Sequence, residues 1–404
     1  MKRRDLLAAT AGLAAAPLAR PHAQKAVTVR WWYHFDDPTA SPAALVSAFE
    51  QQNPDIKITA EAIPWGGGAD YDTRLYTALI AGNGPDAAMV KFNNMPRLMS
   101  MDALAPLDTF IDAWAGRGDI SDDLWKLHRA PDGKRYYLPV QYVILYLYCR
   151  QDWFAQKNLK LPTNFDEFLA AAQALTSGDR WGFGLRGGAG GHDHWATFVL
   201  GGGAKLEKGG LVSAAALAAN RWFIGLHTEK HVFPPSAPSD GFLQTINNMK
   251  SGRTAMTIHH IGSANELTAA LGDAITAVPV PRGPQGNGWA TFGDGSNAVL
   301  SQSKNPEAAW KWVSFLSTGA NNVAFNKLSG QVTVTTSGGK DWPFEPKRFL
   351  DATVASLPIA NVLPASTATA DFTRTVWPQT TQKALLGQIT PDEMMQTFEK
   401  LFFG

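Results

Sequence analysis

The sequence has a single cysteine, Cys149, among its 404 residues. Disulfide bonds within the chain are therefore excluded, and so is a zinc site built on pairs of cysteines. The sequence also contains no HExxH motif and no GxSxG motif, and Cys149 lies in an apolar run that is typical of an inert buried thiol. The stability of the fold must therefore come from apolar burial, and nucleophilic catalysis has no motif to support it.

No hydrophobic run in the sequence is long enough to span a membrane as a helix. Leu6 to Leu18 forms an apolar run of about a dozen residues, and residues 142–149 are of strand length. Lys2, Arg3 and Arg4 precede the first run, and the adjacent arginines resemble a twin-arginine export signal, with cleavage around residues 23–25. The alternative is a basic N-terminus on an ordinary hydrophobic helix. We predict a signal peptide over residues 1–24 and a soluble periplasmic mature protein.

The chain carries little net charge. It is +1 as a whole and −2 once residues 1–24, which carry a net +3, are removed. This balance gives no basic surface for nucleic acid and no attraction to an anionic membrane.

The first part of the mature chain alternates strands and helices. The expected elements are a strand at 27–33, a helix at 43–51, a strand at 56–63, a helix at 71–81 and a buried strand at 87–90. This order predicts a parallel α/β sheet. About 380 mature residues exceed the usual size of one hydrophobic core, so two domains are expected.

The remaining chain contains further helices and one proline-flanked segment. Helices are expected at 163–175, 211–227, 241–251, 305–316 and from 390 onward, with strands at 136–150 and 254–259. The sequence Thr390-Pro391-Asp392-Glu393 predicts a capping box. Prolines at 279 and 281 make residues 277–284 a poor central strand, and they favour a segment that crosses between domains.

The stretch RGGAGGHDHWATFVLGGG, residues 186–203, is the strongest candidate for a functional site, because glycines surround two histidines, an aspartate and a tryptophan. His192 and His194 raise the possibility of a metal site, but two histidines alone do not supply the three or four ligands that zinc needs. A phosphate loop has little support, because neither GxxxxGK[ST] nor GxGxxG occurs there between a strand and a helix. The third alternative is a flexible wall that presents Trp195 to a ligand, with glycines that allow close approach.

Aromatic residues are abundant, with 14 Trp, 8 Tyr and 21 Phe. Several follow strands or open turns, where a flat apolar face beside polar neighbours suits the stacking of a sugar ring. For any single Trp, core packing is an equal alternative. Paired carboxylates that hydrolyse glycosides have no sequence signature, so a hydrolase stays open as an alternative.

A series of short motifs runs in order along nearly the whole mature chain. They are VRWWYHF, FEQQNPDIKI, DYDTRLYTALIAGNGPDAAMV, LAPLD, DGKRYYLPVQYVILYLYCRQDWF, LPTNFDEFLAAAQALT, GRTAMTIHHIGSANEL, VPVPRGP, KNPEAAWKWVSFL and LLGQITPDE. Each motif is weak alone, and their order is specific. Through them the chain resembles the extracellular solute-binding proteins of bacterial ABC importers, in the group of maltose- and other sugar-binding proteins.

The resemblance implies a periplasmic binding protein fold, an α/β fold of two lobes that close on a ligand about a hinge. It implies a first lobe of residues 25–140 and 283–332, and a second lobe of residues 141–282 and 333–404. The chain would cross between them near residues 139–141, 280–282 and 330–332. The prolines at 279 and 281 agree with the second of these.

The resemblance also implies a set of ligand-binding residues. From the positions after three strands these are Trp32, Tyr33, His34, Phe35, Lys91, Phe92, Asn93, His259 and His260. Further candidates by position are Asp36, Trp65, Gln141, Tyr142, Gly293, Asp294, Arg374 and Trp377, together with His192, Asp193, His194 and Trp195 of the glycine-rich stretch. Where maltose-binding relatives carry a stacking Trp, this sequence has Ile261-Gly262, which argues against maltodextrin.

The implied function is non-enzymatic: binding a carbohydrate and presenting it to a membrane permease, as a monomer without metal or cofactor. One alternative is an anionic sugar derivative, such as a sugar phosphate or uronic acid oligomer, held by Lys91, Arg186 or Arg374. Another is a periplasmic enzyme that degrades polysaccharides.

Overall fold

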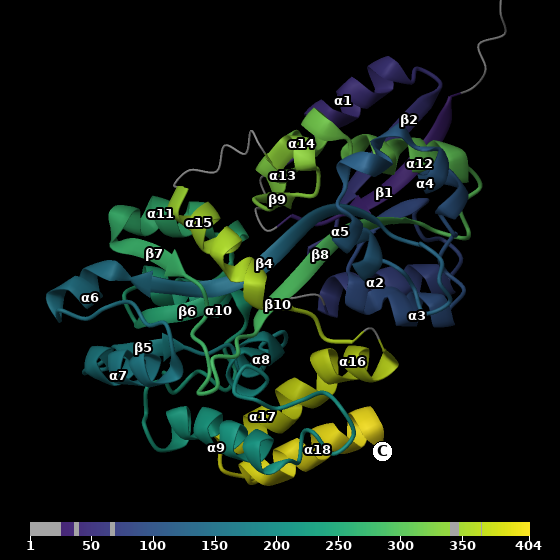
Figure 1. Ribbon diagram of the computed structural model, residues 1–404. Helices are drawn as coiled ribbons and strands as arrows, with labels where there is room; N and C mark the ends of the chain where they lie inside the picture. The colour runs from purple at the N-terminus through teal and green to yellow at the C-terminus, as the bar shows by residue number, and fades with distance from the viewer. Residues whose placement is uncertain (1–25, 36–39, 65–68, 340–346, 365) are drawn as a thin grey trace, which may run out of the picture.

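Two lobes joined by long strands make up the molecule (Figure 1). The computed structural model describes residues 26–35, 40–64, 69–339, 347–364 and 366–404. The predicted signal segment and the candidates Asp36 and Trp65 lie outside these residues. Within them, no helix has both the length and the apolar character that crossing a membrane requires.

The first lobe begins with the predicted alternation of strands and helices. Its strands are β1 (Val27–Tyr33), β2 (Ile56–Ala62) and β3 (Ala87–Val90), and its helices are α1 (Ala43–Gln52), α2 (Ala69–Ile80), α3 (Met95–Ser100), α4 (Asp108–Ala113), α5 (Asp122–Leu127), α12 (Pro306–Leu316), α13 (Gly319–Ser329) and α14 (Thr336–Gly339). Strand β1 pairs in parallel with both β2 and β3, which confirms the predicted parallel sheet. Trp31 is fully buried in this lobe and donates from Nε1 to Asn297 Oδ1 at 2.8 Å.

The second lobe holds most of the remaining elements. Its strands are β5 (Trp181–Gly184), β6 (Thr254–His260) and β7 (Ile275–Val278), and its helices are α6 (Gln151–Gln156), α7 (Phe165–Leu175), α8 (His192–Val199), α9 (Ala214–Thr228), α10 (Phe242–Lys250), α11 (Ala264–Leu271), α15 (Lys347–Ser356), α16 (Thr367–Asp371), α17 (Trp377–Leu385) and α18 (Pro391–Phe403), with a π-helical segment at Phe372–Val376. The capping box of Thr390 and Glu393 is confirmed at the start of α18. The side chain of Asn164 caps α7, whereas Asn305 precedes α12 without a side-chain cap.

Strands β4 (Leu138–Arg150) and β8 (Ala290–Val299) run from one lobe into the other. Residues 138–144 of β4 pair with β8, and residues 145–150 pair with β6 and β7. Residues 296–299, at the C-terminal end of β8, pair with β3. The short strands β9 (Val332–Thr333) and β10 (Ala360–Asn361) add to β4 and β8. One continuous hydrogen-bonded sheet therefore links the lobes.

The proline-flanked segment pairs with the second lobe. Strand β7 ends at Val278, and the backbone of Arg282 then pairs with the second lobe, because its N–H donates to Thr163 O at 2.9 Å and its carbonyl accepts from Phe165 at 3.0 Å. Ala290 is still part of the second-lobe core. The chain returns to the first lobe along β8.

A buried carbonyl marks the start of the link formed by β4. A bulge at Pro139–Gln141 interrupts the pairing with β8. The carbonyl oxygen of Val140 accepts hydrogen bonds from two buried side chains of α13, Asn322 Nδ2 at 2.7 Å and Asn326 Nδ2 at 2.9 Å. Helix α13 therefore fixes the backbone where β4 leaves the first lobe.

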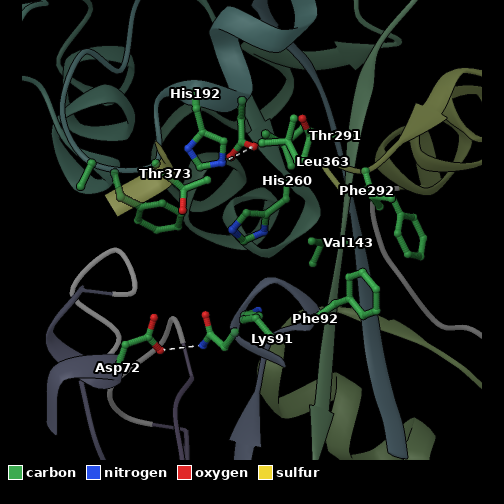
Figure 2. A pocket seen from close by; sticks show the side chains of 18 of the residues that line it. Asp72, Lys91, Phe92, Val143, His192, His260, Thr291, Phe292, Leu363 and Thr373 are labelled. Atoms are coloured by element: carbon green, nitrogen blue, oxygen red, sulfur yellow. Dashed lines mark hydrogen bonds and ion pairs between the residues drawn. The ribbon is translucent and has the colours of Figure 1, made fainter. Parts of the chain in front are cut away.

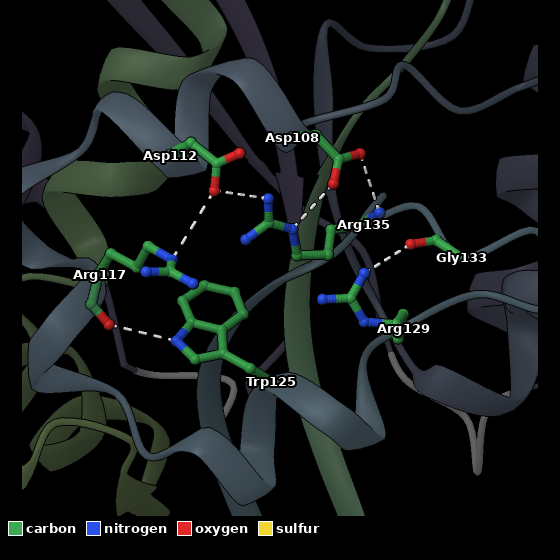
Figure 3. Close-up of polar contacts among 7 residues, drawn as sticks. All are labelled: Asp108, Asp112, Arg117, Trp125, Arg129, Gly133 and Arg135. Atoms are coloured by element: carbon green, nitrogen blue, oxygen red, sulfur yellow. Dashed lines mark hydrogen bonds and ion pairs between the residues drawn. The ribbon is translucent and has the colours of Figure 1, made fainter.

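Arg135 forms ion pairs that stabilise the segment of short helices between β3 and β4 (Figure 3). Its side chain is 6% exposed and contacts Asp108 Oδ1 at 2.9 Å and Asp112 Oδ1 at 2.7 Å, both on α4. Trp125 of α5 donates to the carbonyl of Arg117 in the adjoining turn. These contacts tie the short helices to the approach of β4 and lie away from the cavity described below.

Candidate functional site

A cavity of about 230 Å³ lies between the two lobes (Figure 2). The first lobe contributes Asp72 and Lys91, the second contributes His192, and β8 contributes Thr291 and Phe292 to its wall. The predicted residues that line it are His34, Phe35, Lys91, Phe92, Gln141, His192, Asp193, His260, Gly293 and Arg374. Residues from distant parts of the sequence therefore converge on one space.

The described tryptophans among the candidates do not line the cavity. Trp195 and Trp377 are fully buried in the second-lobe core, where Trp195 donates from Nε1 to Asn220 Oδ1 at 3.1 Å. Trp32 is 5% exposed and donates to Glu61 Oε2 at 2.8 Å. The aromatic faces at the cavity come instead from Phe35, Phe92, Phe242 and Phe292.

Four other candidates lie behind the cavity wall. Tyr33 stacks on Trp31 in the first-lobe core, and Tyr142 stacks on Phe292 with ring centroids 5.7 Å apart. His194 accepts from Arg186 N and contacts Ile258 O, and His259 Nδ1 contacts Ser263 Oγ at 2.8 Å. These side chains support residues of the wall. For Asn93 and Asp294 the structure describes the backbone alone.

The glycine-rich stretch is a tight turn followed by a helix, and its Trp195 is buried and does not line the cavity. Helix α8 begins at His192. A Cβ on Gly190 would lie 1.9 Å from Arg186 Nη2, and one on Gly191 would lie 1.6 Å from the Arg186 carbonyl oxygen. The glycines therefore allow the turn to wrap closely around Arg186, which lines the cavity.

The metal alternative finds no third ligand here. The parts of the chain that the structure describes contain no group of three His, Cys, Asp or Glu side chains placed to hold an ion. His192 and His194 also have different partners from one another. His192 Nε2 lies 3.4 Å from Asp193 Oδ1, whereas His194 Nε2 contacts the backbone carbonyl of Ile258.

Several residues of the cavity wall were not predicted from the sequence. The most important of them is Asp72, because it places a buried carboxylate at the cavity. Asp72 is 4% exposed and lies on α2 one turn before Leu75 and Tyr76, both buried. The sequence did carry a signal for Asp72. Residues three and four positions apart share one helix face, so an acidic residue at this spacing from Leu75 and Tyr76 is expected on the buried face of the helix. Others missed are Asn94, His128, Val143, Leu145, Ala189, Gly190, Phe242, Thr291, Phe292, Ser329, Gln331, Val362, Leu363, Thr369, Ala370 and Thr373.

Strand β8 has glycine where side chains of β4 lie across it. Gly293 and Gly295 are opposite Val143 and Gln141 in the ladder. A Cβ on Gly293 would lie 2.9 Å from Val143, and one on Gly295 would lie 2.4 Å from Gln141. The glycines therefore make room for Val143 and Gln141, two residues of the cavity wall.

Burial shifts the titration of the charged wall residues. Burial raises the pKa of Asp72 to about 6, although Arg374, the hydrogen bond from Asn94 at 2.8 Å and Lys91 oppose this. Burial lowers the pKa of Arg186 to about 10, with Asp193 opposing. Arg186 stays charged and lies 5.2 Å from the Phe242 ring centroid. The wall thus combines charges with apolar faces.

Burial disfavours the charged form of four histidines of this region, His34, His192, His194 and His259. Burial, with a smaller effect of Arg186, lowers the pKa of His194 to about 3. Burial lowers the pKa of His192, and it holds the pKa values of His34 and His259 well below the ordinary value. Neutral imidazoles can donate and accept at once, which suits recognition of hydroxyl groups.

Three polar atoms on wall residues have no hydrogen-bond partner within the described residues. They are His192 Nδ1, Gln141 Oε1 and Thr291 Oγ1, each with its surface buried. A buried polar atom without a partner costs about 1–3 kcal/mol. A ligand that bonds them would recover this cost.

The buried histidines predict that acid destabilises the fold. Below pH 6.5 the unfolded chain binds protons at His34, His194 and His259 that the folded chain excludes, so stability is lost as pH falls; for His194 this loss extends down to a pH of about 3. Asp72 acts in the opposite direction below pH 6, where the folded chain binds its proton more tightly. We expect the free energy of unfolding to fall by about 2 kcal/mol between pH 7 and 5.5, measured by urea unfolding.

Substitution of His194 by Gln tests this origin. The variant should show a smaller change in stability over the same pH interval. His231→Gln, at an exposed histidine, is the control and should keep the wild-type slope. Equal slopes in all three proteins would contradict the assignment.

Comparison with known proteins places the chain among solute-binding proteins. The family model described as bacterial extracellular solute-binding protein matches residues 35–322. A putative binding protein of Brucella abortus (strain 2308) is 26% identical over 363 residues, covering 86% of this chain and 85% of that protein. The maltodextrin-binding protein MdxE of Bacillus subtilis (strain 168) is 26% identical, covering 70% and 69%.

Solved structures show the same two-lobed fold. An ABC transporter solute-binding protein of Thermotoga lettingae TMO bound with alpha-D-tagatose has a TM-score of 0.82 at 22% identity, covering 93% of this chain and 100% of its own. An ABC substrate-binding protein of Listeria monocytogenes in complex with cycloalternan has a TM-score of 0.82 at 18% identity, covering 93% and 98%. At this level of identity the likeness establishes the fold.

Proposed function

Because the chain belongs to the bacterial extracellular solute-binding protein family, we propose that it binds a carbohydrate between its two lobes and delivers it to the permease of an ABC importer. Sugars are the solutes in the names of several relatives, among them maltodextrin, tagatose and cycloalternan. The proposal includes export to the periplasm by the signal at residues 1–24, action as a monomer, and no covalent chemistry.

The observation that carries the proposal is the pairing of phenylalanine faces with unbonded polar atoms in one cavity. Phe35, Phe92, Phe242 and Phe292 offer apolar surfaces on which the C–H face of a sugar can pack. His192 Nδ1, Gln141 Oε1 and Thr291 Oγ1 offer bonds to hydroxyl groups. A solute with both kinds of surface fits this wall better than a purely apolar one.

The size of the cavity favours a small sugar. Its volume of about 230 Å³ lies below the roughly 300–1,000 Å³ of pockets for drug-sized ligands. We therefore propose a mono- or disaccharide in preference to a long oligosaccharide. The absence of a stacking Trp at Ile261-Gly262 is in keeping with a ligand other than maltodextrin.

We also propose a revised division of the lobes. The predicted limits assign residues 283–332 to the first lobe, but Ala290 belongs to the second-lobe core, and Trp289 packs against it. We place this crossing within β8, near residues 293–296, and the others in β4 after Gln141 and after α14. The lobes would then close by bending about strands β4 and β8, which contribute residues to the cavity wall.

The anionic alternative rests on Lys91, Arg186 and Arg374, three cations that line the cavity. Asp72 and Asp193 lie in the same wall, so the positive excess is small. For this reason a neutral sugar is the first proposal, and a sugar phosphate or uronate is the second.

Replacing Gln141 or His192 by alanine should weaken binding of the sugar by about 10- to 100-fold, because each variant removes a bond to a buried polar group. A thermal-shift screen over neutral and anionic sugars identifies the ligand, and titration calorimetry then gives the affinities. Gln388→Ala, at an exposed glutamine, is the control and should bind as the wild type does.

Three outcomes would revise the proposal. A thermal shift with anionic sugars alone, weakened by salt, would establish the anionic alternative. Product formed from oligosaccharides by the purified protein would establish an enzyme. Unchanged affinity in both alanine variants would remove these two residues from the binding site.

A further inference from the structure

The π-helical segment Phe372–Val376 brings one side chain of the second lobe onto the first. Phe372 is fully buried in the second-lobe core, with its ring centroid 5.5 Å from that of Trp195 and 4.9 Å from that of Phe398. Two residues later, the guanidinium of Arg374 lies 5.1 Å from the ring centroid of Tyr76 on α2. π-Helical turns re-aim side chains locally and are frequent at functional sites.

Asp72 lies on the same helix as Tyr76, one turn earlier, so both face Arg374. Asp72 and Arg374 line the cavity from opposite lobes, and the carboxylate is fixed by the Asn94 side chain. Arg374 is also the charged group with the largest opposing influence on the burial-raised pKa of Asp72. A cation of one lobe therefore lies over a ring of the other lobe and lines the same cavity as a carboxylate of that lobe, on which it acts electrostatically.

The other ionisable groups around Asp72 and Tyr76 belong to the first lobe. Lys91 acts on Asp72 from the segment after β3, and Arg97 of α3 acts on Tyr76. Tyr71 adjoins Asp72 in sequence, and its ring meets that of His34 edge-on. These groups move together with Asp72, whereas Arg374 moves with the second lobe.

We propose that Arg374 is a positioning residue that holds the two lobes closed on the solute, by stacking on Tyr76 and attracting Asp72 across the cavity. The proposal rests on the proposed function, since closure matters to transport when the cavity receives a solute. Separation of the lobes would remove both interactions, whereas the hydrogen bond from Asn94 to Asp72 and the electrostatic influence of Lys91 would remain.

Closure through Arg374 has a distinctive dependence on pH. The attraction to Asp72 requires an ionised carboxylate, so it is present above pH 6 and is lost as the pH falls through about 6. Stacking on Tyr76 does not depend on that proton. Loss of Arg374 should therefore cost more affinity at pH 7.5 than at pH 5.0.

The test compares Arg374→Gln with the wild type at both pH values, using titration calorimetry with the sugar found in the screen. We expect about tenfold weaker binding at pH 7.5 and about threefold at pH 5.0. Taking the ratio at each pH removes effects of the cavity histidines common to both proteins. In an Asp72→Asn background, Arg374→Gln should cost about threefold at both pH values.

Arg348→Gln is the matched control. Arg348 lies 5.0 Å from the Phe349 ring centroid and 3.4 Å from Asp273, an equivalent pair of contacts within the second lobe alone. It should leave the affinity unchanged. If Arg374→Gln binds like Arg348→Gln, or loses the same factor at both pH values, Arg374 does not act through Asp72.

A second readout needs no ligand. Lys304→Cys on the first lobe and Lys230→Cys on the second allow two dyes to be attached, because Cys149 is buried. Single-molecule energy transfer should then show fewer closed molecules in Arg374→Gln than in the wild type at pH 7.5. Equal distributions would overturn the proposal. A wild type that binds no sugar would overturn the proposed function and leave this comparison valid.

Discussion

Replacing Gly191 by alanine is expected to lower the free energy of unfolding by about 3 kcal/mol and to abolish ligand binding. The new Cβ would lie 1.6 Å from the carbonyl oxygen of Arg186 and 2.7 Å from the ring of Trp377. The oxygen belongs to the backbone and the ring is fully buried, so neither can move without disturbing the turn. The start of α8 would shift, and His192 and Arg186 would leave their places in the cavity wall.

Gly118→Ala is the control for this substitution. A Cβ at Gly118 would meet no atom within 4 Å, and its backbone does not lie at positive φ. Its stability should stay within about 0.5 kcal/mol of the wild type. Urea unfolding followed by tryptophan fluorescence measures both variants. If Gly191→Ala unfolds at the wild-type urea concentration, the close approach around Arg186 does not constrain the fold.

Replacing Asn322 by alanine should cost about 3–5 kcal/mol of stability. Its amide donates to the carbonyls of Val140 and Leu316 at 2.7 and 3.0 Å, and its Oδ1 accepts from Val334 N at 3.0 Å and from the hydroxyl of Thr333. All of this lies in the interior, so the partners lose bonds that water cannot replace. Asn326 would retain one bond to Val140.

The control is Asn321→Ala on the same helix. Asn321 is partly exposed, and replacing it tests the effect of losing an asparagine from α13 without losing the buried bonds. It should change stability by less than about 0.5 kcal/mol. A loss of similar size in both variants would mean that helix propensity, and not the bonds at Val140, explains the result.

The sequence predicted the elements whose formation depends on local pattern. The strand and helix order of residues 27–90 follows from apolar periodicity, and the cap at Thr390 follows from side chains three residues apart. The tight turn at Gly190 and Gly191 was not predictable, because glycines signal backbone freedom whether the chain is mobile or tightly packed. Only the contact with Arg186 decides between the two.

The cavity itself was less predictable. The sequence could not show which tryptophans are buried and which line the cavity. Trp195 is buried because it packs in one core with residues of α17 and α18, which lie far along the chain. The convergence of Asp72 and Arg374 on one cavity was not predictable, because Arg374 lies about 300 residues later. The pairing of the Arg282 backbone with Thr163 and Phe165 was not predictable either, because prolines do not reveal which segment they lie beside.

The sheet shared by both lobes has a consequence for the order in which the protein can be made. The first-lobe core joins Val29 to Val334, and the second-lobe core joins Ile144 to Phe398. During synthesis, β3 must wait for β8, whose Val299 pairs with Ala87. Neither core can be completed until most of the chain has been translated, so folding is a late event dominated by distant contacts, and we expect it to be slow.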